Sequence, residues 1–571
     1  MMKPYLWTFV SFCLFYLSAP LIAQAEETAS NIDSIQLRSD NFTLSGKIDG
    51  AQGVDMISEL ERFRSALLEI HGLPANSKDQ RVEIYVVSDP EIFGILGVDE
   101  NFIAIYSQTN AGPRALINGS AEAFDASSGS TLRHGLRHEY AHHFTRTYLR
   151  LTEPLWLAEG LAEYYAGYVE NDDGSYHFGA PHEGHEVVLS YPVEGWVDMR
   201  DVLSSLGDIT PARYRRHKHP RQWTQRPDNV SFLYAQSWAL THWALNNSGT
   251  NKGQTDLKAG SDRLAALVDR LIVNDMPLSR NLSLWPEQEA LRVNSETRDE
   301  AIEKSVLLEL GAPLLTAETA ETKAETLDSQ IAAYIEAGVP LLKGQPKPGR
   351  VSSPVVVETL TPAKAAAIQY RQLSLTAGTR AQIHPRMKSL KAEIEADSAS
   401  APSLLISDAA QNFATGSTQT AVNLLAEAVA AGQLTPEDDI LALNVAYGDF
   451  TNRSYQNPEA MRRKIRPVLA RTPEDISLLV MMAGTGIGDL IRPDSVISPE
   501  AHSALKALES LEVTKTRPLQ TLPLVNLYAQ QDNNKEALAL LYRALAFNPS
   551  NRFEAQRIVD ELERRLEPST P

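Results

Sequence analysis

The chain has 571 residues, of which 43% are hydrophobic and 22% are charged. This composition is ordinary for a globular protein, and at roughly 150 residues per domain the length allows three or four domains. The formal net charge of −19 argues against a nucleic-acid-binding surface, because phosphate contacts need clustered lysine and arginine side chains. The same charge argues against docking on an anionic membrane by charge alone.

The first 25 residues have the layout of a secretory signal peptide. Lys3 supplies the positive charge, an apolar stretch over residues 5–22 follows, and Ala23-Gln24-Ala25 forms a small-x-small cleavage site. We expect cleavage after Ala25 and a periplasmic or secreted mature protein with no stable membrane insertion. An uncleaved anchor is the alternative, but the apolar run is short for a membrane span. The one cysteine, Cys13, lies in this segment, so sites built on cysteine are excluded from the mature chain.

Residues 31–130 combine short apolar runs with one helical pattern. Apolar residues recur at helical spacing over residues 54–70. Strands are expected at residues 42–44, 82–87, 102–106 and 115–117. A strand, a helix and further strands in this order predict an N-terminal α/β subdomain.

From Thr131 the pattern becomes helical, and we assign residues 131–342 to a helical subdomain. Helices are expected at residues 131–148, 154–168 and 231–244, with Pro154 in the first turn of the second helix and Thr152 as its N-cap. A basic stretch runs from Arg213 to Arg226. We interpret it as a solvated loop, and the alternative is a rim that attracts acidic substrates.

Glycine, proline and serine gather at residues 341–353, and we predict a linker at residues 343–358. Residues 359–571 are rich in alanine and leucine and are expected to be helical. Pro402, Pro436 and Pro473 stand at helix-start positions, 34 and 37 residues apart. This spacing resembles tetratricopeptide helix pairs, whose period is about 34 residues and whose concave face would bind a protein partner. An irregular helical domain is the alternative.

The main chemical signal is His138-Glu139-Tyr140-Ala141-His142. Residues four apart share one face of a helix, so both imidazoles are able to reach one metal ion, with Glu139 beside it as a general base. Zinc held by two imidazoles and one carboxylate keeps a fourth position open for water and a substrate carbonyl. A helix that carries surface histidines is the alternative for this motif alone.

A second signal, Trp156-Leu157-Ala158-Glu159-Gly160, follows on the next predicted helix. This stretch resembles the ligand helix of gluzincin peptidases. Together with the first motif it resembles the peptidase MA-like group, exported bacterial proteins often joined to tetratricopeptide repeats. The resemblance covers residues 34–342, and only its metal region is specific. It implies a zincin-like fold in which His138, His142 and Glu159 are the zinc ligands.

The resemblance also suggests supporting residues. Glu163, one helical turn after Glu159, is expected to accept a hydrogen bond from a ligand histidine, and it is an alternative ligand or a surface residue. Tyr234 resembles the downstream tyrosine that donates to the oxyanion in this group, and a packed core tyrosine is its alternative. We interpret His134 and His143 as bystanders or supporting residues, and residues 181–186 as an ordinary polar loop. Short strands near residues 103–105 and 115–117 are candidate edges for an extended peptide.

These features predict an α+β zincin-like metallopeptidase domain followed by an all-α, tetratricopeptide-like domain. The predicted function is that of an exported zinc metallopeptidase acting on a protein or peptide. The Gly-x-Met-Glu-Asn run of the aminopeptidase branch is missing from the sequence, so an endopeptidase is favoured. Two alternatives stay open. One is a helical-repeat binding scaffold with a structural or vestigial metal site, and the other is a zinc hydrolase of non-peptide amide bonds.

Overall fold

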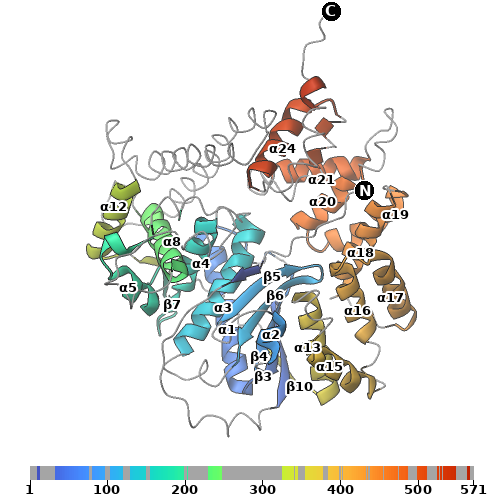
Figure 1. The fold of residues 1–571 in the computed structure, drawn as a ribbon, viewed down its shortest axis with the longest axis horizontal. Coiled ribbons are helices and arrows are strands. Elements are labelled where there is room, and N and C mark those ends of the chain that lie inside the picture. Colours follow the sequence, from blue (N-terminus) through green and yellow to red (C-terminus); the bar gives the residue numbers. More distant parts are fainter. Residues whose placement is uncertain are drawn as a thin grey trace, which may run out of the picture. The chain divides into compact units, whose positions relative to one another are not determined.

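The computed structural model shows a mixed α+β protein with a large sheet, a small sheet and many helices (Figure 1). It describes residues 10–12, 33–75, 77, 80–89, 91–96, 103–119, 129–149, 155–197, 202, 229–246, 324–339, 341–344, 354–376, 384–397, 400, 403–432, 434, 438–453, 456–473, 475–486, 498–510, 524–525, 528–529, 531–547 and 562–565. Most of the predicted signal peptide, Pro154 with Thr152, the basic stretch from Arg213 to Arg226, Pro402 and Pro436 lie outside these residues.

The chain divides into two compact units. The first, here called the sheet unit, comprises residues 1–69, 73–143 and 347–478. The second unit comprises residues 70–72, 144–346 and 479–571. Within the residues that the structure describes, no helix is both long enough and apolar enough to cross a membrane.

The large sheet has the strand order β1-β5-β6-β4-β3-β2-β10. The strands are β1 (Val10–Phe12), β2 (Ser34–Arg38), β3 (Phe42–Lys47), β4 (Val82–Val87), β5 (Ala104–Thr109), β6 (Gly112–Asn118) and β10 (Val356–Thr359). The β3–β4 and β4–β6 pairs are parallel, and the other pairs are antiparallel. Leu44 pairs with Ile84, and Ile84 pairs with Ala115, which sets the register of the central strands.

The expected strands at residues 42–44, 82–87 and 115–117 are confirmed as β3, β4 and β6. The strand expected at residues 102–106 instead runs from Ala104 to Thr109 as β5. Strands β2 and β10 were not predicted, and they pair with each other across more than 300 residues of sequence. Strand β1 falls inside the predicted signal peptide, so removal of that segment would leave a six-stranded sheet.

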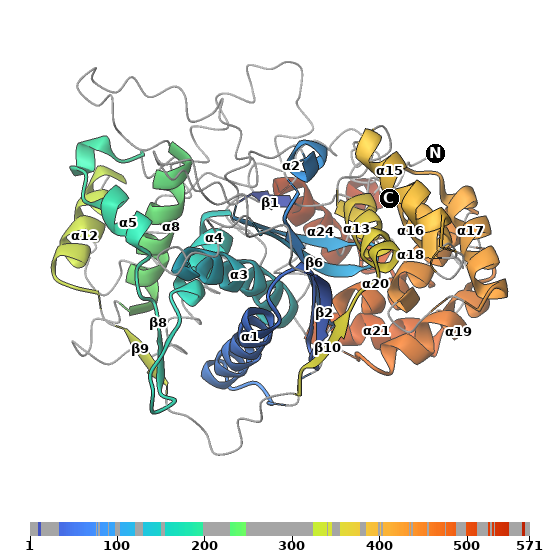
Figure 2. The ribbon, with the colours of Figure 1, turned by 90° about the horizontal axis from the view of Figure 1, so that it is seen from below.

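One face of the sheet is covered by α1 (Gly50–Ile70) and α3 (Gly129–Phe144), as Figure 2 shows. Side chains alternate between the two faces of a strand, and the apolar members of β2 and β3 point to this side. Phe42 meets Tyr140 of α3 with ring centroids 5.1 Å apart, and Gly53 of α1 lies against Leu37. The helix expected at residues 54–70 is therefore confirmed, and it forms half of the cover over this face.

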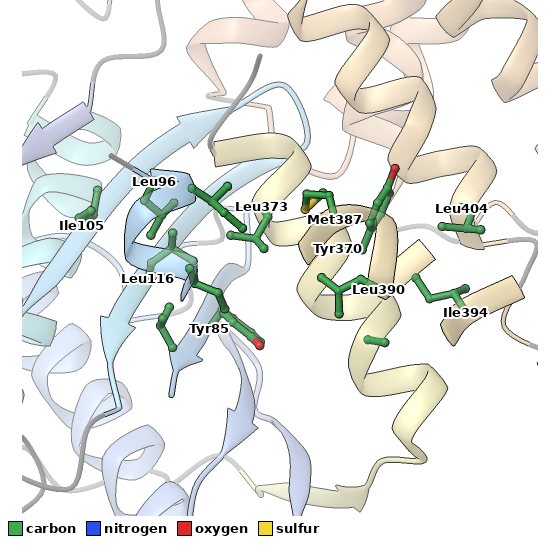
Figure 3. Close-up of a cluster of buried hydrophobic side chains, with 14 residues drawn as sticks. Tyr85, Leu96, Ile105, Leu116, Tyr370, Leu373, Met387, Leu390, Ile394 and Leu404 are labelled. Atoms are coloured by element: carbon green, nitrogen blue, oxygen red, sulfur yellow. The ribbon is translucent and has the colours of Figure 1, made fainter. Parts of the chain in front are cut away.

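The opposite face is covered by α13 (Pro362–Thr376) and α15 (Pro385–Glu395), which come from the C-terminal part of the sequence. Figure 3 shows the buried cluster that joins them to the sheet and to α2 (Glu91–Leu96). Tyr85 and Leu116 come from the strands, and Leu373 and Met387 come from the helices. The C-terminal helices thus complete the core of the N-terminal sheet.

The expected helical character of the C-terminal part is confirmed for the residues described. The helices are α16 (Ser403–Ala414), α17 (Thr418–Ala430), α18 (Asp439–Asn452), α19 (Pro458–Leu469), α20 (Ile476–Gly484), α21 (Pro499–Ser510) and α24 (Asn534–Phe547). Alternate helices begin at Ser403, Asp439 and Ile476, just beyond the three prolines that predicted helix starts. Consecutive helices α16 to α19 pack on one another.

The second unit holds η3, a π-helix (Thr145–Leu149), and α4 (Leu155–Ala166), which follow α3 in sequence. Its other elements between residues 144 and 346 are β7 (Val169–Glu170), β8 (Tyr176–Phe178), α5 (Glu183–Leu189), η4 (Val193–Gly195), α8 (Asn229–Asn246), α12 (Ala324–Glu336) and β9 (Leu342–Gly344). Helices α21 and α24 also belong to this unit. Strands β7, β8 and β9 form the small sheet. The predicted linker at residues 343–358 therefore contains the end of β9 and most of β10.

Candidate metal centre

Helix α3 carries the first predicted motif and is anchored from both sides. Leu132, Leu136 and Tyr140 are buried, and Tyr140 contacts Phe63 of α1 at a ring-centroid distance of 5.9 Å. A Cβ atom at Gly135 would lie 2.6 Å from Ile103 Cγ2, so glycine allows α3 to touch the start of β5 one turn before His138. The helix passes directly into the π-helix η3, a distortion that is common at functional sites.

His138 and His142 lie on one face of α3 because they are four residues apart. Their Nε2 atoms are 2.9 Å apart, and their rings are nearly perpendicular at 82°. Two nitrogens bound tetrahedrally to one ion at 2.0–2.1 Å would be about 3.3 Å apart. The two imidazoles therefore converge as ligands of a common cation do, to within a few tenths of an ångström.

Glu159 of α4 completes the group. One ligand atom from each of His138, His142 and Glu159 lies within 4.8 Å of the other two, and all three side chains are buried. The described part of the chain holds no other cluster of three histidine, cysteine or acidic side chains with this spacing. The structure thus brings the predicted ligands together into a buried group able to hold a metal ion.

The donor set of this group fits a transition metal. Two imidazoles and one carboxylate suit zinc and its neighbours, whereas calcium and magnesium prefer oxygen donors alone. Glu159 is 0% exposed, and an ionised carboxylate is costly to bury unless a cation or hydrogen bonds compensate. Three protein ligands also leave one position of a tetrahedral site for a further ligand.

The position of helix α4 is set by Gly160, the residue that follows the candidate ligand Glu159. A Cβ atom at Gly160 would lie 2.2 Å from Thr241 Oγ1 and 2.3 Å from the carbonyl oxygen of Ser237, both on α8. Real Cβ atoms do not approach other atoms so closely, so α4 and α8 meet backbone to backbone at this point. The position of Glu159 is therefore fixed by a helix contact that only glycine permits.

Glu139, the predicted base, lies next to His138 on α3 and is 0% exposed. Glutamate is almost never fully buried without a specific reason, and a helix surface would have served a purely structural residue. Its burial beside two converging imidazoles is consistent with a chemical role. That role remains a prediction.

Glu163 is also fully buried on α4, and its carboxylate Oε2 lies 3.4 Å from Nε2 of His185. His185 belongs to α5, in the segment that we interpreted as a polar loop. That interpretation is wrong, because residues 183–189 form a helix that His182 caps by accepting a hydrogen bond from the Gly184 amide. With His182 as the N-cap and Glu183 in the first turn, this sequence is compatible with the start of a helix. That local signal would have placed His185 on a helix.

Tyr234 lies on α8 and is 2% exposed. Ser237 and Thr241 follow it at spacings of three and seven residues, so the three side chains share the face of α8 that meets α4. His143 instead faces the sheet, where its Nδ1 lies 3.1 Å from the hydroxyl of Tyr106. The structure therefore separates His143 from the ligand group, and the role of Tyr234 stays a prediction.

Another buried histidine, His242, lies on α8 beside α4. His242 is 0% exposed, its Nδ1 lies 2.8 Å from the hydroxyl of Tyr334, and its ring is 5.2 Å from that of Tyr164. Burial lowers the pKa of His242 to about 4. This imidazole is therefore neutral near pH 7 and places no positive charge next to α4.

Comparisons with known proteins do not add to this description. No protein-family model, no curated protein and no solved structure matches the chain. A function must therefore be inferred from the residues of the site.

Proposed function

We propose that the protein is an exported zinc-dependent metallopeptidase in which His138, His142 and Glu159 hold the ion and Glu139 is the general base. The observation that carries this proposal is the buried group of two imidazoles and one carboxylate, with ligand atoms within 4.8 Å of one another. A fully buried Glu139 in the same helical turn supplies the residue that hydrolysis requires and a structural metal site does not.

Zinc held by His138, His142 and Glu159 would supply a Lewis acid for a peptide carbonyl and would lower the pKa of a water molecule to about 7. Glu139 accepts the proton that water loses as its oxygen bonds to the carbonyl carbon. When the carbon–nitrogen bond breaks, Glu139 donates this proton to the leaving amine. Tyr234 is proposed as a donor to the oxyanion, from the face of α8 that meets α4.

The outer edge of β5 supports binding of an extended peptide. Strand β1 pairs with this edge in antiparallel fashion, with Phe12 opposite Ile105 and Val10 opposite Ser107. The edge therefore accepts an extended segment, and removal of the signal peptide would open it to another chain. Because α3 rests on the start of β5 at Gly135, a peptide on this edge would run beside the helix that carries the motif.

A test of this proposal measures zinc content and casein cleavage on the mature chain. We expect about one zinc ion per wild-type molecule, no zinc and no cleavage for His138→Ala, and retained zinc for Glu139→Gln. Cleavage by Glu139→Gln should fall by about 10³-fold, since loss of a general base commonly costs 10²- to 10⁴-fold.

The same measurements separate the alternatives. Bound zinc without cleavage of casein or of a mixed peptide library would favour a structural site in a binding scaffold, or a non-peptide amide as substrate. No zinc after reconstitution would overturn the proposal. The helical region is proposed to recruit a protein substrate or partner.

A further inference from the structure

A cavity of about 840 Å³ lies within the sheet unit, on the sheet face that α13 covers. Strands β2, β3 and β4 form one wall, and the opposite wall comes from α13, from the starts of α16 and α18, and from the end of α19 with the residues that follow it. Cavities of about 300–1,000 Å³ take drug-sized ligands. The cavity is therefore large enough for an organic ligand of that size.

The strand wall of this cavity is polar, although helices cover it. Gln36, Thr43 and Ser45 point into it and are each at least 92% buried. The face of a sheet that helices cover is normally apolar. Another part of the same face follows this rule, because Tyr85 and Leu116 belong to the hydrophobic core shown in Figure 3. A polar wall under a helical cover departs from what packing alone would select.

The charges of the cavity are numerous and balanced. Four arginines line it, namely Arg38, Arg81, Arg371 and Arg471. Arg371 pairs with Asp438 at 2.6 Å, and Arg471 pairs with Asp439 at 2.5 Å.

Four carboxylates also line the cavity, namely Asp40, Glu83, Asp438 and Asp439. Glu83 is paired with Arg114, which lies behind the wall. Burial would raise the pKa of Glu83, but Arg114 and Arg371 outweigh this effect and hold the pKa below its usual value. The carboxylate is therefore ionised, and the formal charges of the lining cancel.

Such a lining favours a ligand that carries both charges and is neutral overall. The Arg371–Asp438 pair is largely buried, whereas the Arg471–Asp439 pair is exposed. Neither kind of ion pair contributes much net stability, so their concentration in a cavity wall is better explained by recognition. The described lining includes no aromatic side chain on which a base or a sugar ring would stack. Ile368, Ile406 and Val468 provide apolar surface among the charges.

We propose that this cavity binds a short peptide with free termini, whose carboxylate meets the arginines and whose ammonium group meets the carboxylates. A tripeptide suits the volume better than a single amino acid. The site is separate from the candidate metal centre, because its strand residues alternate with those that face α1 and α3. The proposal therefore stands or falls independently of peptide hydrolysis.

Calorimetric titration of the full mature chain tests this proposal. The Glu139→Gln variant is used, so that no peptide is consumed, with tri-alanine, Ala-Lys-Ala and Ala-Glu-Ala as probes. We expect saturable binding at one site, weakened at least tenfold when the same peptides are acetylated and amidated at their ends. The double substitution Arg38→Ala with Arg471→Ala should weaken binding at least tenfold. The matched control, Arg463→Ala, changes an exposed arginine of α19 outside the lining and should have no effect.

Arg38 and Arg471 are exposed, so folding should survive both changes, and circular dichroism and the melting temperature check this. Three results would each overturn the proposal. They are absence of saturable binding, equal binding of blocked and free peptides, and binding that the Arg38/Arg471 substitutions leave unchanged. The last result would place the peptide at another site, and a repeat with His138→Ala would show whether that site is the metal centre.

Discussion

The ligand candidates differ from the other buried histidines in what each imidazole meets. His138 and His142 face each other at 2.9 Å and share their space with a carboxylate. His143 meets a tyrosine of the sheet, and His242 meets Tyr334. Burial alone does not mark a metal ligand, since all four are buried, so the partner chemistry decides the assignment.

The choice between Glu159 and Glu163 as the third ligand gives a prediction about metal affinity. Glu159 belongs to the converging group, whereas Glu163 lies against His185. Glu159→Ala should therefore lower zinc affinity by more than about 100-fold, because it removes a bond to the metal. Glu163→Gln should lower it by about tenfold to 100-fold at most, the range for residues that support a ligand. Competition with a coloured chelator measures both, and a larger loss for Glu163→Gln would make Glu163 the ligand.

His242 gives a prediction about stability and pH. Its pKa is lowered from 6.5 to about 4 in the folded protein, so below pH 6.5 the unfolded chain takes up a proton that the folded chain does not. The stability contributed by the neutral form is fully present above pH 6.5 and is lost as the pH falls to 4. The loss is up to about 3 kcal/mol in the free energy of unfolding.

Urea unfolding of wild type and His242→Gln at pH 7 and pH 4.5 measures this effect. The difference between the two pH values should shrink in the variant by up to about 3 kcal/mol. His502→Gln changes an exposed histidine and serves as the control. An unchanged pH dependence in His242→Gln would contradict the assignment.

At the scale of elements, the candidate metal centre depends on how α4 packs. Gly160 lets α4 approach α8 so closely that any side chain would meet a backbone carbonyl. Gly135 has a similar role where α3 crosses the start of β5. Both glycines lie within one turn of a candidate ligand, so backbone contacts, and not the side chains of the candidate ligands, set the positions of these residues.

Gly160→Ala should therefore disturb both stability and the metal site. Overpacking commonly costs about 1–3 kcal/mol, and here the added methyl group would stand 2.3 Å from a carbonyl oxygen that cannot rotate away. We expect a lower melting temperature and weaker zinc binding, measured by calorimetry and chelator competition. Gly50→Ala at the start of α1 is the matched control, because a Cβ atom there meets nothing within 4 Å. Equal effects of the two substitutions would exclude the close helix contact as the cause.

At the scale of the molecule, the sheet unit is discontinuous in sequence. Helices α13 and α15 bury Tyr85, Leu116 and their neighbours, and β10 pairs with β2. The N-terminal sheet therefore obtains one of its covers and its last strand from residues after 346. A boundary at the predicted linker would cut through a core.

Truncation gives a prediction at this scale. A fragment of residues 26–346 should lack cooperative unfolding and should bind a hydrophobic dye, because the face around Leu116 would be exposed. Co-expression of residues 347–571 should restore a soluble complex, since those residues hold the missing helices. A fragment 26–346 that melts cooperatively by itself would show that the N-terminal part is an independent domain.

The sequence by itself determined the local features of this protein. The ligand motif on α3 depends on a four-residue helical repeat, and β3, β4 and the helix at residues 54–70 depend on local hydrophobic patterns, so each was predictable. The helix starts after the three prolines were predictable for the same reason.

Only the tertiary structure decided the long-range features. It paired β10 with β2, placed α13 over the sheet, and buried His185 against Glu163. It also formed a charged cavity between strands and helices that are more than 300 residues apart in sequence. These arrangements depend on which distant surfaces bury one another. A short strand such as β2 or an exposed strand such as β10 carries no local pattern that identifies its partner strand.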